Sequence, residues 1–281
     1  MLTDGQSSTA NENSVDGRTA IVTGGGRGIG RAIAIRLARE GYSIGLVARS
    51  AGQIEETADL VRKAGGKAEV CAGDVADPAA VELATRTFLG SFGHVDVVVN
   101  NAACTGPMSP FLDIDTAEWR RVLETNIIGP VLLLKSVLPS MLARGHGYVV
   151  NVNSLQGSDP SGSPLPYGVS KAGLMRLTDG LAGQLAGTGI VVVDLSPGLV
   201  HTELTSERAD LDALPDSAWA PPEQAADQLA RLVSGRYDQL HGRFVRAADD
   251  LDGLSARLAG EPNGRILRLT SKEIAVPLKG A

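Results

Sequence analysis

The stretch Thr23-Gly24-Gly25-Gly26-Arg27-Gly28-Ile29-Gly30 decides the fold that we predict for this chain. It follows the apolar run Thr19–Thr23, which is typical of a buried strand, and leads into a helical pattern over Ile29–Glu40. A glycine-rich turn between a strand and a helix lets a dinucleotide pyrophosphate approach backbone amides at the helix N-terminus. The alternative is a tight structural turn, but five glycines are more than turning the chain requires. We therefore expect nucleotide binding here.

Short apolar runs alternate with helical patterns from Arg18 onward. The runs are nearly continuous in Val, Ile and Leu, as strands buried on both faces require. We expect further strands at Ser43–Ala48, Lys67–Ala72, Val95–Asn100, Gly147–Val152 and Ile190–Leu195, and a seventh at Gly242–Val245. We expect helices at Gln53–Ala64, Ala79–Ser91, Thr116–Arg144 with a bend at Gly129-Pro130, Tyr167–Ala186 and Pro221–Val233. The alternation predicts an α/β fold, a single-domain Rossmann-type doubly wound parallel sheet of about seven strands with helices on both faces.

The domain organisation follows from composition along the chain. Residues 1–16 are rich in Ser, Thr, Asn and Asp, which predicts a disordered leader. No linker divides residues 17–248, which we interpret as one dinucleotide-binding and catalytic domain. Residues 249–281 are expected to form a C-terminal extension packed on or near the same domain.

Charge and cysteine content exclude several classes of function. The net charge is −6 and no basic run exceeds two residues, which disfavours nucleic acid or an anionic membrane as a partner. Cys71 and Cys104 offer neither a disulfide framework nor metal-ligand spacing, so no metal is expected. Apolar runs such as Val131–Leu134 are too short to span a bilayer, and the N-terminus lacks the pattern of a signal peptide. We expect a cytoplasmic protein.

The end of the second strand distinguishes cofactors with and without a ribose 2′-phosphate. An acid there holds the ribose hydroxyl of NAD, whereas a cation suits the phosphate of NADP. Here the strand ends Leu46-Val47-Ala48-Arg49-Ser50 without an acid, and Arg27 lies in the glycine-rich turn. Two guanidinium groups and a serine predict NADP(H) in preference to NAD(H). The alternative is that both arginines are solvated surface charges.

A phenol and an ammonium lie four residues apart in Tyr167-Gly168-Val169-Ser170-Lys171. On a helix this spacing places both on one face. The ordinary pKa of a tyrosine is near 10, and a neighbouring cation lowers it by roughly 1–3 units. Such pairs also occur as surface packing, so the meaning of this one depends on the surrounding motifs.

Several further motifs accompany the pair. Asn100-Asn101-Ala102-Ala103 follows the fourth strand, Asn126 lies in the long helix, and Ser154 precedes Tyr167 by 13 positions. Together with the turn pattern Thr-Gly-x3-Gly-x-Gly, they make the chain resemble the short-chain dehydrogenase/reductase family over residues 17–246. Asn153 stands where that family often has a second serine, and Ala103 where it usually has glycine. The C-terminal region lacks the family's frequent Asp-Gly-Gly ending.

The resemblance implies a catalytic set of Asn126, Ser154, Tyr167 and Lys171. Tyr167 would exchange a proton with the substrate oxygen, and Ser154 would hold that oxygen. Lys171 would bind the nicotinamide ribose and lower the pKa of the tyrosine, and Asn126 would hold a water of the proton relay. The alternative for Asn126 is a polar residue at a helix kink. The expected cofactor-binding set is Gly24, Gly26, Arg27, Gly28, Ile29, Gly30, Arg49, Ser50, Asp74, Val75, Asn101, Ala102, Tyr167, Lys171, Pro197, Gly198, Val200 and Thr202.

These expectations predict an NADPH-dependent oxidoreductase that reduces a ketone or aldehyde to an alcohol, with Tyr167 as general acid. The alternatives are an NAD(P)+-dependent alcohol dehydrogenase and a non-catalytic dinucleotide-binding regulator. The segment Glu203–Ala220, expected as a loop-like substrate lid, carries five acids against Arg208 and apolar residues such as Leu211 and Trp219. It favours a neutral, apolar carbonyl or alcohol substrate, unless it is only a solvated loop. The resemblance implies a homodimer or homotetramer.

Overall fold

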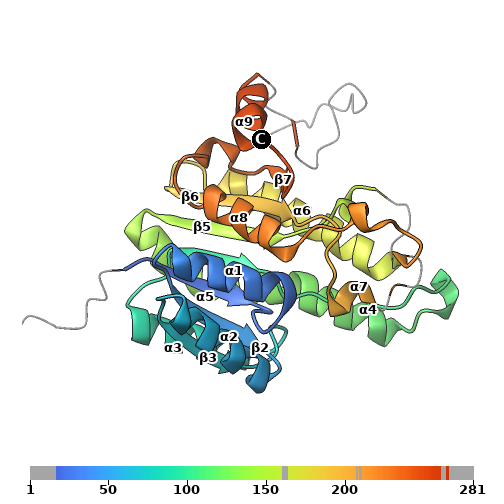
Figure 1. The fold of residues 1–281 in the computed structure, drawn as a ribbon, viewed down its shortest axis with the longest axis horizontal. Coiled ribbons are helices and arrows are strands. Elements are labelled where there is room, and N and C mark those ends of the chain that lie inside the picture. Colours follow the sequence, from blue (N-terminus) through green and yellow to red (C-terminus); the bar gives the residue numbers. More distant parts are fainter. Residues whose placement is uncertain (1–16, 160–163, 207, 209–210, 261–263, 266–281) are drawn as a thin grey trace, which may run out of the picture.

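The computed structural model of the protein describes residues 17–159, 164–206, 208, 211–260 and 264–265. The leader predicted for residues 1–16 and most of the end of the chain therefore lie outside the described residues. The described part folds around one sheet (Figure 1), which confirms the predicted α/β architecture.

Seven parallel strands form the sheet in the order β3-β2-β1-β4-β5-β6-β7. The order reverses direction between β1 and β4, which is where ligands bind in doubly wound sheets. Each strand begins and ends within two residues of its expected bounds. The strands are β1 (Thr19–Thr23), β2 (Ser43–Ala48), β3 (Ala68–Ala72), β4 (Val97–Asn100), β5 (Gly147–Val152), β6 (Ile190–Ser196) and β7 (Phe244–Arg246).

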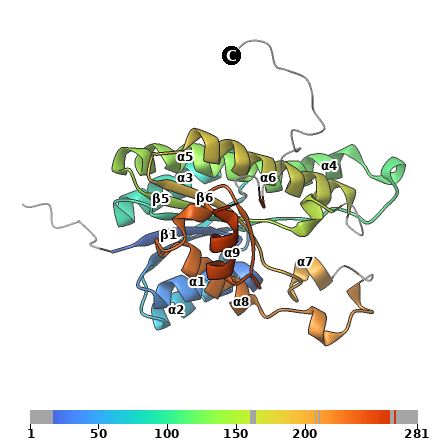
Figure 2. The same ribbon diagram turned by 90° about the horizontal axis from the view of Figure 1, so that it is seen from above.

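Helices cover both faces of the sheet, as Figure 2 shows. On one face lie α3 (Pro78–Phe92), α5 (Gly129–Arg144) and α6 (Leu165–Gln184). On the other lie α1 (Gly28–Arg39), α2 (Ala51–Lys63) and α8 (Pro222–Leu232). Each face has its own apolar cluster, because the buried strands send alternate side chains to the two sides. Gly45 in β2 allows close packing, since a methyl group there would lie 2.8 Å from the ring of Phe88.

The C-terminal part extends the second of these clusters. After β7 the chain forms α9 (Leu251–Leu258). Its three leucines, Leu251, Leu254 and Leu258, are buried in the same cluster as Leu229 and Leu232 of α8. The beginning of the extension therefore shares the core of the main fold.

The long helix predicted for Thr116–Arg144 is interrupted earlier than expected. It consists of α4 (Thr116–Leu123), a π-helical turn at Glu124–Ile128, and α5. Pro130 lies in the first turn of α5, directly after the π-helical turn, and has no N–H to donate to that turn. The irregularity falls instead at the turn that contains Asn126. Such turns are frequent at functional sites.

Taken as one helix, Thr116–Arg144 is long and apolar enough to cross a membrane, with a mean hydropathy of 1.5 over its most apolar window. The expectation that every apolar stretch is too short for a bilayer is therefore wrong for this helix as a whole. Leu133, Leu134, Val137 and Met141 pack in the core beneath the sheet. A core helix of a soluble protein passes the same test, so the length and composition are weak evidence for a membrane span.

The segment Glu203–Ala220, expected as a loop, contains the short helix α7 (Glu203–Ser206). Its two ends are joined by a parallel bridge between Val200 and Ala220 and by stacking of the His201 and Trp219 rings, whose centroids lie 3.6 Å apart. The segment therefore leaves and rejoins the main fold at one place.

Candidate active site

The glycine-rich turn connects β1 to α1 at the carboxyl edge of the sheet. Gly24 and Gly28 have φ values of 63° and 53°, in the left-handed region that favours glycine. A methyl group on Gly30 would lie 2.3 Å from the carbonyl oxygen of Gly24 and 2.5 Å from Nδ2 of Asn101. The Asn101 amide donates to the carbonyl oxygens of Thr23 (2.9 Å) and Gly24 (3.2 Å), which ties the turn to the end of β4.

This turn can receive a pyrophosphate. The helix α1 begins at Gly28, and Arg27 before it provides no side-chain cap for the first N–H groups. Uncapped N–H groups at a helix N-terminus bind anions. Ile29 and Gly26, which were expected to contact the cofactor, lie on either side of Gly28 in the same turn.

The residues expected to contact the adenosine end lie after β2 and β3. Arg49 and Ser50 are exposed at the end of β2, and Arg49 forms no ion pair with any described residue. Asp74 accepts a hydrogen bond from the backbone N–H of Ala76 (2.9 Å), and Val75 is buried against Gly129. Both segments therefore face the same edge of the sheet as the glycine-rich turn.

Arg27, the other predicted phosphate ligand, pairs with a carboxylate. Its guanidinium forms an ion pair with Glu203 of α7, and both side chains are about half exposed. Glu203 was expected in the substrate lid and Arg27 at the cofactor, and the structure brings the two together.

The segment after β6 also approaches the glycine-rich turn. Pro197 and Gly198 follow the strand, Val200 is buried, and Thr202 lies close to Gly28. A methyl group added to Gly28 would lie 3.2 Å from Cγ2 of Thr202. The residues after β6 that were expected to bind the cofactor therefore lie beside the glycine-rich turn.

Asn126 is held within the π-helical turn. Its Oδ1 accepts from the backbone N–H of Cys104 (2.9 Å), while Nδ2 donates to the Cys104 carbonyl (2.8 Å) and to Oγ of Ser170 (2.9 Å). None of these bonds among described residues reaches Lys171. They support the alternative of a polar residue at a helix kink, and the water relay stays a prediction. Burial raises the pKa of the Cys104 thiol, which disfavours a nucleophilic role for it.

Ser154, Tyr167 and Lys171 come together between β5 and α6. Ser154 follows β5, and Tyr167 and Lys171 lie on the first turns of α6, both buried. The Lys171 Nζ lies 5.5 Å from the centroid of the Tyr167 ring and donates to the carbonyl oxygen of Val152 (2.8 Å). The phenol, the ammonium and the serine therefore lie close together, as predicted.

The pKa of Tyr167 moves opposite to the predicted direction. Burial raises it to about 12, opposed by a hydrogen bond from Ser154 and by the charge of Arg208. Loss of solvation outweighs the interactions that lower this pKa, so its net shift is opposite to the one expected from a neighbouring Lys171. The hydroxyl is therefore fully protonated at neutral pH. Burial lowers the pKa of Lys171 to about 8, while Asp194 acts to raise it.

Three residues near this site were missed as site residues in the sequence. Arg208 was counted only as a cation among lid acids, yet it is buried with 7% exposure. Asn153 was noted only as a departure from a family pattern, and it bonds to Asp194 of β6. The signal for Asp194 was available, since it is a charged residue inside the apolar run Ile190–Ser196. Within the described part of the chain, no group of His, Cys, Asp and Glu side chains could hold a metal ion.

Comparisons with known proteins agree with this geometry. Residues 18–212 match the family described as short chain dehydrogenase. A short chain dehydrogenase of Pseudocercospora fijiensis is 33% identical over 272 residues, covering 91% of this chain and 88% of the relative. A variant of actinorhodin polyketide ketoreductase, solved with NADPH, has a TM-score of 0.77 at 29% identity, covering 82% of this chain and 95% of that one. NAD+-bound xylitol dehydrogenase has a TM-score of 0.75 at 27% identity, covering 82% and 96%.

Fold, site and relatives thus define one class, a nicotinamide-dependent oxidoreductase on a Rossmann-type sheet. The chain belongs to the short-chain dehydrogenase/reductase family.

Proposed function

We propose that this protein is an NADPH-dependent reductase that converts a ketone or an aldehyde to an alcohol. The observation that carries the proposal is the Tyr167 hydroxyl, which is buried, hydrogen-bonded to Ser154 and close to the Lys171 ammonium. A phenol is protonated at neutral pH, and burial raises the pKa of this one further, so it can donate a proton to a carbonyl oxygen.

The other residues of the site support that proton transfer. Ser154 donates a hydrogen bond toward the same oxygen as negative charge develops on it. Lys171 holds the ribose hydroxyls next to the nicotinamide, and Asn126 keeps the π-helical turn in shape beside Cys104 and Ser170. In this proposal Ser154, Tyr167 and Lys171 act on reacting groups, and Asn126 is a candidate for the water relay.

The residues at the sheet edge fit a phosphorylated dinucleotide. The backbone of Gly24–Gly30 suits the pyrophosphate, Asp74, Val75, Asn101 and Ala102 suit the adenosine, and the 197–202 segment suits the nicotinamide. When bound, NADPH supplies the hydride. Exposed Arg49 with Ser50 favours a 2′-phosphate, and Arg27 adds to it when it leaves Glu203.

We propose a neutral carbonyl compound with an apolar substituent as the substrate. Leu204 and Leu211 are half-buried in the lid, Leu214 is exposed, and Trp219 is half-buried beside His201. The family resemblance implies a homodimer or homotetramer, and we include this assembly and a cytoplasmic location in the proposal.

An activity screen tests the proposal. NADPH oxidation is followed at 340 nm with aliphatic ketones, aromatic ketones, aldehydes and 2-oxo acids, each with NADH as matched cofactor control. The oxidative alternative, favoured by the NAD+-bound neighbour, is tested by alcohols with NADP+ or NAD+. We expect turnover with NADPH and ketones, abolished in Tyr167→Phe. Turnover confined to alcohols with NAD+ would reject the reductase proposal, and saturable NADPH binding without turnover on any compound would favour a regulator.

A further inference from the structure

Asp194 is a buried carboxylate in the middle of the sheet. It lies on β6 with 2% exposure. Its Oδ1 accepts two hydrogen bonds, one from Nδ2 of Asn153 (3.0 Å) and one from Oγ1 of Thr178 (2.8 Å). A buried charge is costly unless the structure fixes and compensates it. Two donors on a single oxygen fix this one.

The carboxylate is the end of a chain of side-chain hydrogen bonds. Asn100 donates to Asn151 (2.8 Å), Asn151 donates to Thr178 (2.8 Å), and Thr178 donates to Asp194. Every donor points toward the carboxylate, so it is the final acceptor. On its other side, Asn153 uses its Oδ1 to accept from the backbone N–H of Ser154 (2.8 Å). A displacement of Asp194 would therefore reach the catalytic serine through one residue.

Lys171 adjoins this network through β5. The residue is 3% exposed, and its Nζ donates to the carbonyl oxygen of Val152 (2.8 Å), the residue directly before Asn153. It forms no ion pair with any described residue. The charged groups that act to raise its pKa are Asp194 and the Cys104 thiol. Burial keeps Cys104 protonated at neutral pH, which leaves the carboxylate. Lys171 and Asp194 are thus the opposite charges that act on each other in this part of the core.

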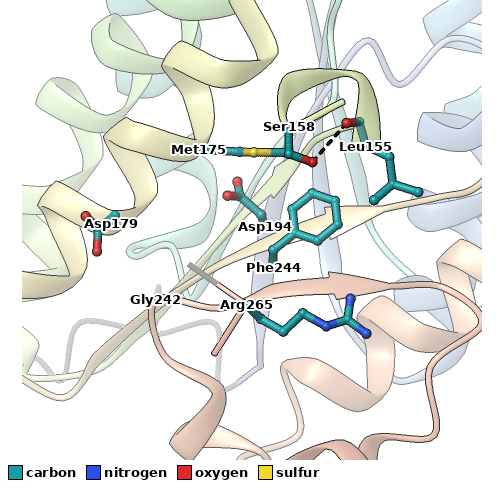
Figure 3. A pocket seen from close by; sticks show the side chains of 8 residues that line it. All are labelled: Leu155, Ser158, Met175, Asp179, Asp194, Gly242, Phe244 and Arg265. Carbon is teal, nitrogen blue, oxygen red and sulfur yellow. Dashed lines mark hydrogen bonds between the residues drawn. The ribbon is translucent and has the colours of Figure 1, made fainter. Parts of the chain in front are cut away.

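A cavity of about 170 Å³ adjoins the carboxylate (Figure 3). Asp194 lines it together with Met175, Phe244 and two further charged residues, Asp179 of α6 and Arg265. Asp179 pairs with Arg176, and Arg265 bonds to Asp249 at 3.3 Å. Both neighbours therefore have partners of their own, and the cavity has room for water that would solvate the free carboxylate oxygen.

We infer that Asp194 is a positioning residue that acts as the buried counter-ion of Lys171 and keeps the lysine protonated in the pH range of catalysis. The carboxylate does not touch the reacting atoms. It acts through the charge of Lys171 and, by way of Asn153, through the position of Ser154. Its consequence for turnover rests on the proposed function, whereas its consequence for Lys171 does not.

The sign of the effect follows from two opposed tendencies. Burial raises the pKa of Asp194 to about 7, so the carboxylate is charged only above neutral pH. Burial lowers the pKa of Lys171 to about 8, so the ammonium needs its counter-ion most in the range where Asp194 is ionised. Replacing Asp194 by Asn removes the charge and retains an oxygen that accepts from Asn153 and Thr178. The substitution therefore separates charge from geometry.

The first test reads Lys171 directly. The chain contains six lysines, so ¹³Cε-lysine labelling gives few resonances, and Lys171→Gln assigns the one of interest. We expect Asp194→Asn to lower the measured pKa of Lys171 by roughly half to one pH unit. Asp179→Asn, which removes another acid from the same cavity, should leave it unchanged. An equal titration in wild type and Asp194→Asn, or an equal fall in both variants, would overturn the inference. In wild-type protein, the Lys171 chemical shift should show a second inflection near pH 7, where Asp194 ionises. This measurement tests the inference without the variant, should the variant fail to fold.

The second test is kinetic. With any carbonyl that the screen identifies, the ratio of wild-type to Asp194→Asn kcat should be near 1 at pH 6 and rise to about threefold to tenfold above pH 8. A role limited to packing would give the same ratio at every pH, and that result would overturn the inference. If the Lys171 resonance shifts as expected but no carbonyl is turned over, the proposed function fails and this inference stands.

Discussion

Arg27 of the glycine-rich turn and Glu203 of α7 form an ion pair across 176 residues of sequence. The pair joins the side of the site proposed for the 2′-phosphate to the first residue of the proposed substrate lid. An arginine that holds a carboxylate is not available to a phosphate at the same time. Glu203 is therefore a competitor of the cofactor for Arg27.

Glu203→Gln should strengthen NADPH binding. Both side chains are about half exposed, so the ion pair contributes little, and freeing Arg27 should lower the Kd of NADPH by roughly twofold to fivefold. The Kd of NADH should not change, because it lacks the 2′-phosphate. Fluorescence titration of both cofactors measures this. Asp212→Asn, an exposed lid acid, is the control, and an equal gain for NADH would show that the effect is not phosphate recognition.

Arg49→Asp should reverse the cofactor preference. An acid at the end of β2 repels a 2′-phosphate and accepts a hydrogen bond from a ribose hydroxyl. Loss of a charge-assisted bond predicts a NADPH affinity lower by about 10- to 100-fold, with unchanged or improved NADH affinity. Arg39→Asp, at the opposite end of α1, should change neither. A selectivity ratio that stays constant in Arg49→Asp would remove the basis for NADPH.

Gly30→Ala should abolish cofactor binding. The added methyl group would lie 2.3 Å from the carbonyl oxygen of Gly24, so the turn must open. Gly52→Ala is the matched control, because a methyl group in that helix meets no atom within 4 Å. It should stabilise the protein by about 0.5–1 kcal/mol through the helix preference of alanine. Thermal unfolding and NADPH titration of both variants measure the difference, and normal binding by Gly30→Ala would contradict this account of the turn.

Tyr167→Phe should lower kcat by about 10²- to 10⁴-fold, the usual contribution of a general acid, without weakening cofactor binding. Tyr148 of β5 is another buried tyrosine, and its hydroxyl donates to Asp238 (3.0 Å). Tyr148→Phe should leave kcat unchanged. Steady-state kinetics with NADPH compare the two. Because burial holds the Tyr167 pKa near 12, wild-type turnover should lose no activity to phenol ionisation between pH 7 and 9.

Asp194→Asn should become more stable than wild type as the pH rises. Folding raises the Asp194 pKa from 3.8 to about 7, so its contribution to stability is complete below pH 4 and is lost by pH 7. The Tm values of wild type and Asp194→Asn should agree near pH 4, and the variant should have the higher Tm above pH 7. Each kcal/mol of difference in the free energy of unfolding shifts the Tm by about 2–4 °C.

Asp249→Asn is expected to behave in the opposite way and is the control for that experiment. Burial tends to raise the Asp249 pKa, but hydrogen bonds from Arg246 and the charge of Arg265 outweigh it and lower the pKa. Its contribution is present above about pH 4 and is lost on acidification. The variant should therefore be less stable than wild type at neutral pH. The same sign for both variants would contradict the electrostatic account.

The sequence was sufficient for features that depend on neighbouring residues. The glycine-rich turn, the apolar strands and the Tyr167–Lys171 spacing each lie in one short segment, and their periodicity predicts their structure directly. The π-helical turn lies a few residues before the expected bend at Gly129-Pro130, and the bond between its Asn126 and Cys104 joins residues 22 positions apart, which local periodicity does not predict. The direction of the Tyr167 pKa was wrong because burial is a property of the whole fold. The Arg27–Glu203 pair was missed because the fold brings together two residues that are 176 positions apart in the sequence.

The hydrogen bonds that run from Asn100 through Asn151 and Thr178 to Asp194 also fix how three strands lie against each other. Asn100, Asn151 and Asp194 are direct partners across β4, β5 and β6, which are otherwise valine-rich. A slip of β5 by one residue would turn Asn151 to the opposite face of the sheet and set a valine between two polar side chains. The apolar strands alone would resist such a slip weakly, since valine replaces valine. The polar row thus specifies the alignment of the central sheet, and with it the relative heights of Ser154 and the cofactor edge.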